Sequence, residues 1–353
     1  MITPPHEPRR NRRPRQSSLE LLRIVAMLLV LLIHYIPFRG ALTPAVAQNA
    51  VGATLATLSL KSLCIGCVNL FVLISGYFGI RPKWNSMLRL VGDIAIWIAV
   101  ALAITYIMDD FSGGLSFVAD SYLFAFSHWF VVSYLGLCLL SPVLNAWLDK
   151  TDDRRLLRYI VVFYIFSTLF GYFFYARFHR PVDFNEGMSI LSFVGLYLVG
   201  TMIRRGGFSW LRKDKMVYLG VFAGCGLFLV AVSYLALRLG ITVSPYGYIN
   251  PFVVVESAAL FIFFTKLRLG EVRWINIVAG SAFAVFIFHY VSPCHQYYNQ
   301  ICSYIQETYS PAFPGVIIFM VAIYAFVVTV DYIRHKLAGI CRYSISAVLS
   351  LVR

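Results

Sequence analysis

Long apolar runs recur along the chain from residue 19 to residue 333, separated by short polar segments. Most runs are about 20 residues long, which is the length that an α-helix needs to cross a bilayer. The pattern predicts an all-α, polytopic integral membrane protein with about ten transmembrane helices. The predicted spans are residues 19–37, 62–80, 87–108, 121–147, 156–176, 188–203, 217–238, 249–266, 275–291 and 314–333.

The composition agrees with this fold class. Hydrophobic residues make up 59% of the 353 positions and charged residues only 13%, whereas about a quarter of an average soluble domain is charged. We find no soluble domain and no repeat of fixed period. The predicted organisation is a disordered basic tail over residues 1–16, a transmembrane domain over residues 17–335 and a C-terminal tail over residues 336–353.

The formal net charge of +14 could suggest a nucleic-acid partner, but the positions of the charges indicate a membrane topology instead. With the N-terminus in the cytoplasm, all but five of the 30 Lys and Arg residues fall on the cytoplasmic side. This asymmetry is the positive-inside rule. We therefore expect both termini to be cytoplasmic, the bilayer to be the main partner, and no nucleic acid to bind.

The first span, "LRIVAMLLVLLIHY", contains two ionisable residues, Arg23 and His34. Ionisable groups inside a membrane are costly and usually face a cavity or each other. The two residues are eleven positions apart, about 20° more than three helical turns, so they share one face about 16 Å apart. Glu20 lies on the same face and can pair with Arg23.

Other predicted spans carry further polar residues. By the predicted topology His128, Glu256 and His289 fall in the outer half of the membrane, at about the depth of His34. Each residue alone also fits a structural role, such as a hydrogen bond to a neighbouring helix. Three histidines and a glutamate at one depth instead favour a shared polar cavity.

The second span ends in polar and basic residues. Asn69 and Ser75 lie in its later part, and Arg81, Lys83 and Arg89 follow at the predicted cytoplasmic surface. These cations also fit the role of ordinary positive-inside anchors.

Two chemistries suit a polar cavity lined by these residues. One is acyl transfer with His as general base and a phosphorylated donor bound by the cations, and the other is proton-coupled transport.

Four segments of the sequence resemble a known family. "LELLRIVAMLLVLLIHY", "NLFVLISGYFGIRP", "HWFVVSYLGLCLLSPVLN" and "FAVFIFHY" occur in the order found in the membrane-bound type-3 acyltransferases, which modify bacterial surface glycans. The resemblance covers residues 17 to about 333. It implies transfer of an acyl group, most simply acetyl, from cytoplasmic acetyl-CoA or another acyl-CoA to a glycan or lipid-linked saccharide hydroxyl outside the bacterial cytoplasmic membrane.

The resemblance and the predicted depths suggest roles for the polar residues. The resemblance implies that His34 is catalytic and that Arg23 assists donor binding or catalysis, while depth alone suggests Glu256 as a third catalytic group. We expect no metal site. The expected donor-binding residues are Arg23, Ser75, Arg81, Lys83 and Arg89, and the expected acceptor-binding residues are Asn69, His128, Trp129, His289 and Tyr290.

The sequence is compatible with several alternatives. Transfer can be direct or can pass through an acyl-Ser75 or acyl-His34 intermediate. The chain can instead be an exporter of a glycan or lipid-linked sugar, or a scaffold among glycan-assembly proteins. Cys294 and Cys302 share a predicted outer loop, where either a disulfide or a packing role fits.

Overall fold

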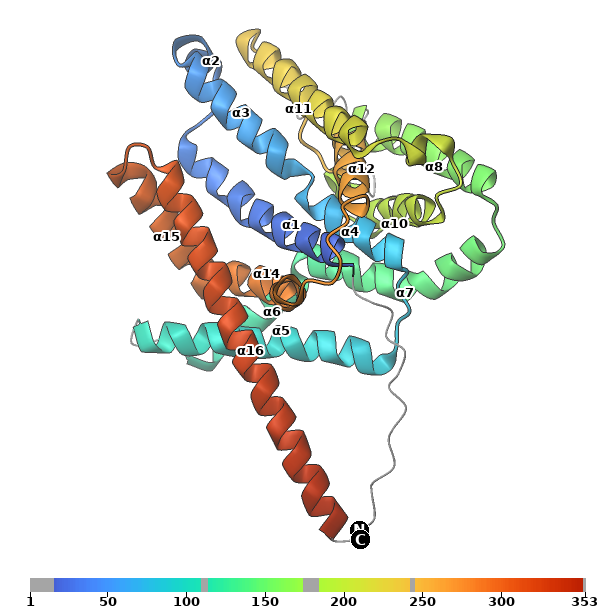
Figure 1. Cartoon of the computed structure of the whole chain (residues 1–353). Coiled ribbons are helices and arrows are strands. Elements are labelled where there is room, and N and C mark those ends of the chain that lie inside the picture. The colour runs from blue at the N-terminus through green and yellow to red at the C-terminus, as the bar shows by residue number, and fades with distance from the viewer. Residues whose placement is uncertain (1–15, 109–113, 174–183, 242–244, 352–353) are drawn as a thin grey trace.

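The computed structural model describes residues 16–108, 114–173, 184–241 and 245–351. Within these ranges the regular secondary structure is helical and contains no strand (Figure 1). The predicted N-terminal tail lies outside the described residues, apart from Gln16. The expected C-terminal tail from residue 336 continues the last helix as far as Leu351.

Helices occur at the predicted spans, but three of these spans, at 62–80, 121–147 and 275–291, are each divided between two helices. In chain order they are α1 (Ser17–Tyr35), α2 (Pro44–Asn49), α3 (Val51–Ile65), α4 (Cys67–Phe78), α5 (Trp84–Met108), α6 (Gly114–Ser127), α7 (Trp129–Asp149), α8 (Asp153–Thr168), α10 (Ile190–Arg205), α11 (Lys215–Arg238), α12 (Pro251–Thr265), α13 (Arg273–Gly280), α14 (Ala282–Tyr290), α15 (Ser292–Thr308) and α16 (Phe313–Leu351).

Six helical segments of the described chain are long and apolar enough to cross a membrane, and a bent pair formed by α13–α14 and α15 would make a seventh. The expected number of ten is therefore not confirmed. The predicted spans at 188–203 and 249–266 correspond to α10 and α12, with 16 and 15 residues. Helices of that length reach about 24 Å and 22 Å, less than the hydrocarbon core of about 30 Å.

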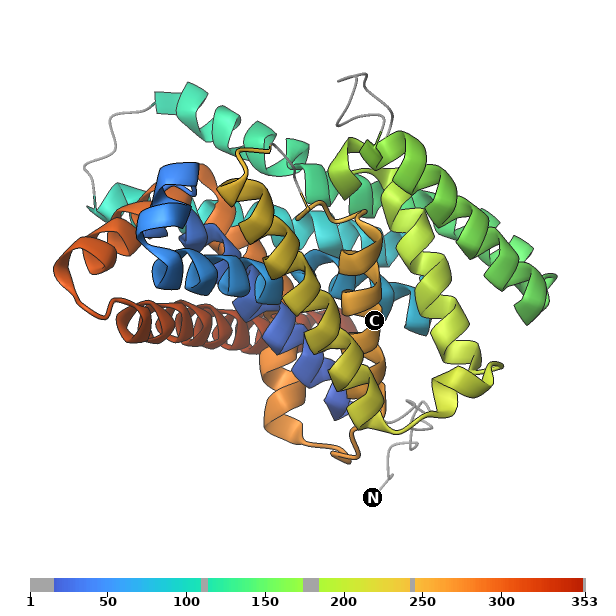
Figure 2. The ribbon, with the colours of Figure 1, turned by 90° about the horizontal axis from the view of Figure 1, so that it is seen from above.

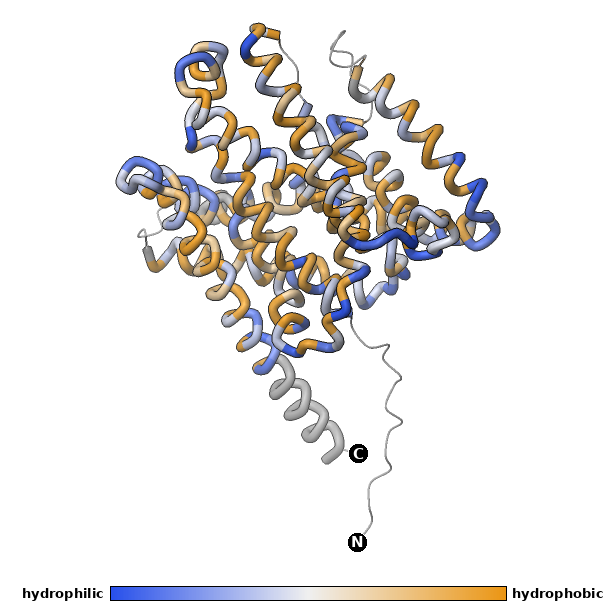
Figure 3. The backbone as a smooth tube through the Cα atoms, turned by 45° about the horizontal axis from the view of Figure 1, so that its top comes forward, coloured by the Kyte–Doolittle hydropathy of each residue, from blue (hydrophilic) through white to orange (hydrophobic). Residues whose placement is uncertain are grey.

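The arrangement of apolar side chains agrees with a multi-pass membrane protein. Hydrophobic positions run along most helices, and hydrophilic positions gather near helix ends and connections (Figure 3). Large apolar side chains also face outward, among them Leu139, Leu227 and Ile318 at 70–73% exposure. Such a surface is unusual for a soluble protein and is the one that lipid tails would cover.

Helix α1 lies inside the bundle, where it packs against α3, α4, α12, α13 and α14 (Figure 2). Its apolar residues Leu22, Met27 and Leu31 are fully buried. Gly76 on α4 allows the neighbouring helix α10 to approach closely, because a Cβ at this position would lie 2.3 Å from the Tyr197 carbonyl oxygen. This packing fixes one wall beside α1.

The segment after α14 forms a helix where a loop was expected. Helix α15 turns 83° away from α13–α14, and Tyr298 on it donates a hydrogen bond of 2.6 Å to the Leu31 carbonyl oxygen of α1. Cys294 and Cys302 are buried, free thiols on this helix. Eight residues of helix separate them by about 12 Å, too far for a disulfide, so the packing role holds.

Candidate active site

A cavity of about 640 Å³ lies between α1, α4, α5, α7, α13 and α14, and we call it the central cavity. Its wall contains charged, hydroxyl, imidazole and aromatic groups. The lining residues are Glu20, Arg23, Val30, Ile33, His34, Cys67, Val68, Phe71, Ile74, Ser75, Leu90, Asp93, His128, Trp129, Phe130, Tyr134, Met188, Tyr248, Ala279, Gly280, Ala282, Phe283, Phe286 and Tyr290.

Arg23 and His34 both line the central cavity, as their helical spacing predicted. Arg23 lies one and a half turns into α1, and His34 is its penultimate residue. The cavity therefore extends along about 16 Å of the helix axis. We call the Arg23 end the inner end and the His34 end the outer end.

The inner end holds an ion pair. Arg23 Nη1 donates to both carboxylate oxygens of Glu20, at 3.0 and 3.1 Å. The guanidinium also lies 5.9 Å from the ring centroid of Phe78. Glu20, 7% exposed, thus holds Arg23 in one orientation and leaves its other N–H groups available to a ligand in the cavity.

Two hydroxyl groups meet along the wall between α4 and α7. Ser75 Oγ donates to the Phe71 carbonyl oxygen at 2.9 Å and lies 3.3 Å from the Tyr134 hydroxyl. The hydroxyl proton of Ser75 is therefore already used in a hydrogen bond to the backbone. The Tyr134 hydroxyl can then donate either to Ser75 or to a group that passes along the cavity.

The outer end carries His34 in a defined tautomer. His34 Nδ1 lies 2.7 Å from the Val30 carbonyl oxygen. Because a carbonyl oxygen can only accept, Nδ1 carries a hydrogen, and in the neutral imidazole Nε2 then has the free lone pair. This is the protonation pattern that a general base needs.

Other rings surround this imidazole. The ring centroid of His34 lies 5.2 Å from that of His289, 6.0 Å from that of Tyr290 and 6.3 Å from that of His295. His289 is 1% exposed, and its Nδ1 donates to the Val285 carbonyl oxygen at 3.1 Å. Across the described chain, no group of three or more His, Cys, Asp or Glu residues is placed to hold a metal ion.

Aromatic side chains extend the outer end toward α7 and the segment before α12. The rings of His128 and Tyr290 are 4.1 Å apart, and those of Trp129 and Tyr248 are 5.7 Å apart. All four residues line the central cavity. Asn69 does not line it but donates from Nδ2 to the Tyr248 carbonyl oxygen at 3.0 Å, and so supports this wall.

Six predicted site residues do not line the cavity: Asn69 and His289, which lie behind its wall, and four others. Arg81 and Lys83 are in the connection between α4 and α5, and Arg89 is bonded to the Asn85 carbonyl oxygen on α5. Glu256 is buried on α12, and its Oε1 would lie 3.1 Å from a Cβ on Gly226 of α11. The expected common depth therefore does not bring Glu256 to His34, because its helix turns that side chain toward α11.

Among the lining residues with a carboxyl or hydroxyl group, the sequence did not indicate Asp93, Tyr134 and Tyr248. Asp93 falls inside the predicted span 87–108, so it could have been found as an intramembrane acid. Tyr134 lies in an aromatic-rich predicted span and Tyr248 directly before another, and nothing in the local sequence separates them from the other 20 tyrosines of the chain.

The fold and the cavity define a multi-pass membrane protein with a polar site that extends deep into the helix bundle. The family model of the type-3 acyltransferases, described as an acyltransferase domain, matches residues 16–332. This range covers most of the chain and all the residues of the central cavity. The chain belongs to the type-3 acyltransferase family. No curated protein and no solved structure gives a significant match.

Proposed function

We propose that this membrane acyltransferase moves an acyl group, most simply acetyl, from cytoplasmic acyl-CoA to a hydroxyl of a glycan or lipid-linked saccharide on the outer side. The observation that carries the proposal is the central cavity itself, which joins Arg23 to His34. A donor and an acceptor that stay on opposite sides of a membrane need such a passage in order to react.

The charge distribution supports the orientation. Arg204 and Arg205 end α10, Lys213 and Lys215 lie at the start of α11, and Lys266 follows α12. These helix ends share the side of the inner end of the cavity if successive spans alternate in direction. By the positive-inside rule this side is cytoplasmic, which in bacteria would make the protein an inner-membrane enzyme.

The dimensions suit a CoA donor. The separation of about 16 Å between Arg23 and His34 is close to the length of an extended pantetheine arm. Anionic phosphates at the inner end would meet the guanidinium of Arg23, which forms strong charge-assisted hydrogen bonds with phosphate. The thioester would then lie beside His34.

The proposed reaction is direct transfer. His34 Nε2 takes the proton of the acceptor hydroxyl while the hydroxyl oxygen attacks the thioester carbonyl carbon. The tetrahedral intermediate collapses by breaking the carbon–sulfur bond, and the imidazolium returns its proton to the leaving thiolate. The products are an ester and free CoA thiol, and the enzyme ends in its starting protonation state.

Ser75 fits this scheme as part of the donor channel. Its hydroxyl is bonded to the Phe71 carbonyl oxygen and to Tyr134, and no base within the described contacts takes its proton. An activated serine nucleophile needs such a base.

The aromatic groups of the outer end suit the acceptor. Trp129 and Tyr248 among them supply flat apolar faces and polar edges that fit a sugar ring.

Purified protein in detergent tests the function directly. Incubation with acetyl-CoA and a bacterial surface saccharide should release free CoA thiol and give the saccharide an added mass of one acetyl group. His34→Ala should abolish both signals, and Arg212→Gln, an exposed substitution away from the central cavity, should retain them. Wild-type protein that binds no CoA and releases no thiol would contradict the proposal and favour the exporter alternative.

A further inference from the structure

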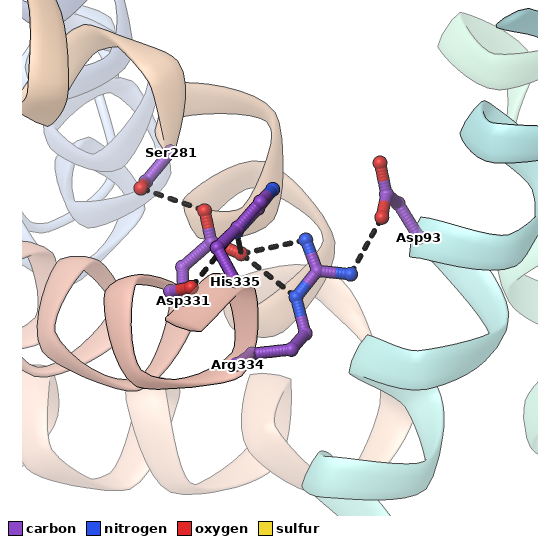
Figure 4. A network of polar contacts seen from close by, with 5 residues as sticks. All are labelled: Asp93, Ser281, Asp331, Arg334 and His335. Carbon is purple, nitrogen blue, oxygen red and sulfur yellow. Dashed lines mark hydrogen bonds and ion pairs between the residues drawn. The ribbon is translucent and has the colours of Figure 1, made fainter. Parts of the chain in front are cut away.

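A second arginine lies beside the wall of the central cavity. Arg334 on α16 donates from Nη1 to Asp93 Oδ1 of α5 at 2.6 Å, and from Nε and Nη2 to Asp331 Oδ1 at 3.0 and 2.8 Å (Figure 4). Asp331 is 5% exposed and also accepts from Ser281 Oγ at 2.8 Å. Ser281 follows Gly280, a residue of the cavity wall.

Arg334 and Arg23 are held in the same way. Each guanidinium is paired with a buried carboxylate three residues earlier on its own helix, Asp331 for Arg334 and Glu20 for Arg23. This neighbour fixes one edge of the guanidinium and leaves another edge for a second anion. For Arg334 that second anion is Asp93.

Asp93 is the member of the network that lines the central cavity. Its side chain is 40% exposed and that of Arg334 is 22% exposed, whereas that of Asp331 is 7% exposed. An ion pair that is open to solvent can exchange one partner at little cost, while the buried Asp331 would stay in place. The exchangeable contact therefore lies at the cavity wall, where an incoming anion would meet it.

We propose that Arg334 is a second phosphate-binding residue for the acyl-CoA donor and that Asp93 is its counter-ion while the donor is absent. The inference rests on the proposed function. A donor phosphate would take the place of the Asp93 carboxylate on Nη1 of Arg334, while Arg23 would bind a further phosphate oxygen or the start of the arm. Arg81, Lys83 and Arg89 lie outside the cavity wall and would act at longer range.

A purely structural clamp between α5 and α16 is the competing explanation. The two explanations differ in what they predict for ligands with and without phosphate. A clamp that only shapes the cavity would affect CoA and pantetheine alike, because both present the same arm. A phosphate-binding residue would affect CoA alone.

Binding of CoA and of pantetheine to purified protein in detergent, measured by calorimetry, separates these cases. Arg334→Gln should weaken CoA binding by about tenfold and leave pantetheine binding within about twofold. Asp93→Asn should tighten CoA binding severalfold, because it removes the competing anion, and should leave pantetheine binding unchanged. Arg212→Gln, at an exposed cation distant from the cavity wall, should change neither.

The outcomes separate a failure of the Arg334 assignment from a failure of the proposed acyl transfer. If wild-type protein binds CoA and both variants leave that affinity unchanged, or shift CoA and pantetheine equally, Arg334 is not a phosphate ligand and the proposed acyl transfer is unaffected. If wild-type protein binds no CoA, the proposed function fails as well. Should Arg334→Gln not fold, Asp93→Asn still decides the question, because only phosphate binding predicts tighter CoA affinity.

Discussion

His34 Nδ1 lies 2.7 Å from the carbonyl oxygen of Val30, four residues earlier on α1. The contact requires the hydrogen to be on Nδ1, and it leaves Nε2 as an acceptor. It also orients the ring, because the acceptor belongs to the backbone of a buried helix. If His34 is the base, as we propose, its own helix would orient it without a carboxylate partner.

Replacement of this imidazole should remove most of the activity. His34→Asn keeps an N–H group that can reach the Val30 carbonyl oxygen but has no basic nitrogen. We expect the turnover number of His34→Asn to fall by about 10²–10⁴-fold, the usual contribution of a general base. Free-thiol release under saturating acetyl-CoA measures it. Residual activity near the wild-type level, in a variant with unchanged thermal unfolding, would show that another group takes the proton.

The aromatic wall should act on the acceptor and not on the donor. The rings of Trp129 and Tyr248 lie 5.7 Å apart at the outer end of the central cavity. Trp129→Ala should raise the KM for the saccharide by roughly tenfold, since ring contacts of this kind contribute about 0.5–1.5 kcal/mol beyond area burial, and should leave the KM for acetyl-CoA unchanged. Trp129→Phe keeps an aromatic ring and should therefore raise the KM for the saccharide less than Trp129→Ala does. A change in the donor KM alone would contradict this assignment.

The position of Arg23 and His34 on one wall of the cavity follows from helix geometry. Once residues 19–37 are recognised as a helix, the spacing of Arg23 and His34 places both on one face, and both line the cavity. The apolar runs likewise predict the helical class and most helix positions. The helices and the shared face of Arg23 and His34 depend only on local sequence, so they can be predicted from it.

Features that depend on the rotation of a helix could not be predicted in this way. Helix α12 is apolar on nearly all sides, so its sequence does not determine which neighbour Glu256 faces. The break between α13 and α14 at Ser281 contains no proline, and the contact of Arg334 with Asp93 joins residues 241 positions apart. Such relationships arise only from the packing of the whole bundle.

The close contact of α4 with α10 should be sensitive to a single methyl group. A Cβ on Gly200 would lie 2.4 Å from the Leu73 carbonyl oxygen and 2.9 Å from the Tyr77 nitrogen. Both are backbone atoms, so the helices must separate. Gly200→Ala should lower the free energy of unfolding by about 1–3 kcal/mol, seen as a lower midpoint of thermal unfolding in detergent.

Gly220 on α11 provides the matched control for this substitution. A Cβ on Gly220 would have no neighbour within 4 Å, and alanine has the better helix propensity. Gly220→Ala should therefore leave the midpoint unchanged or raise it. Equal destabilisation by both alanines would mean that α4 and α10 do not pack as closely as described.

The orientation of the cavity can be tested by thiol labelling of spheroplasts. Gln48 is exposed on α2 and lies beyond the His34 end of α1, and Glu271 is exposed in the connection between α12 and α13, flanked by Arg268 and Arg273. By the positive-inside rule the basic connection is cytoplasmic. A membrane-impermeant maleimide should therefore label Gln48→Cys in intact spheroplasts and Glu271→Cys only after lysis, above the background of the native cysteines. The reverse pattern would put His34 on the same side as acyl-CoA, and a passage through the membrane would then have no role in the reaction.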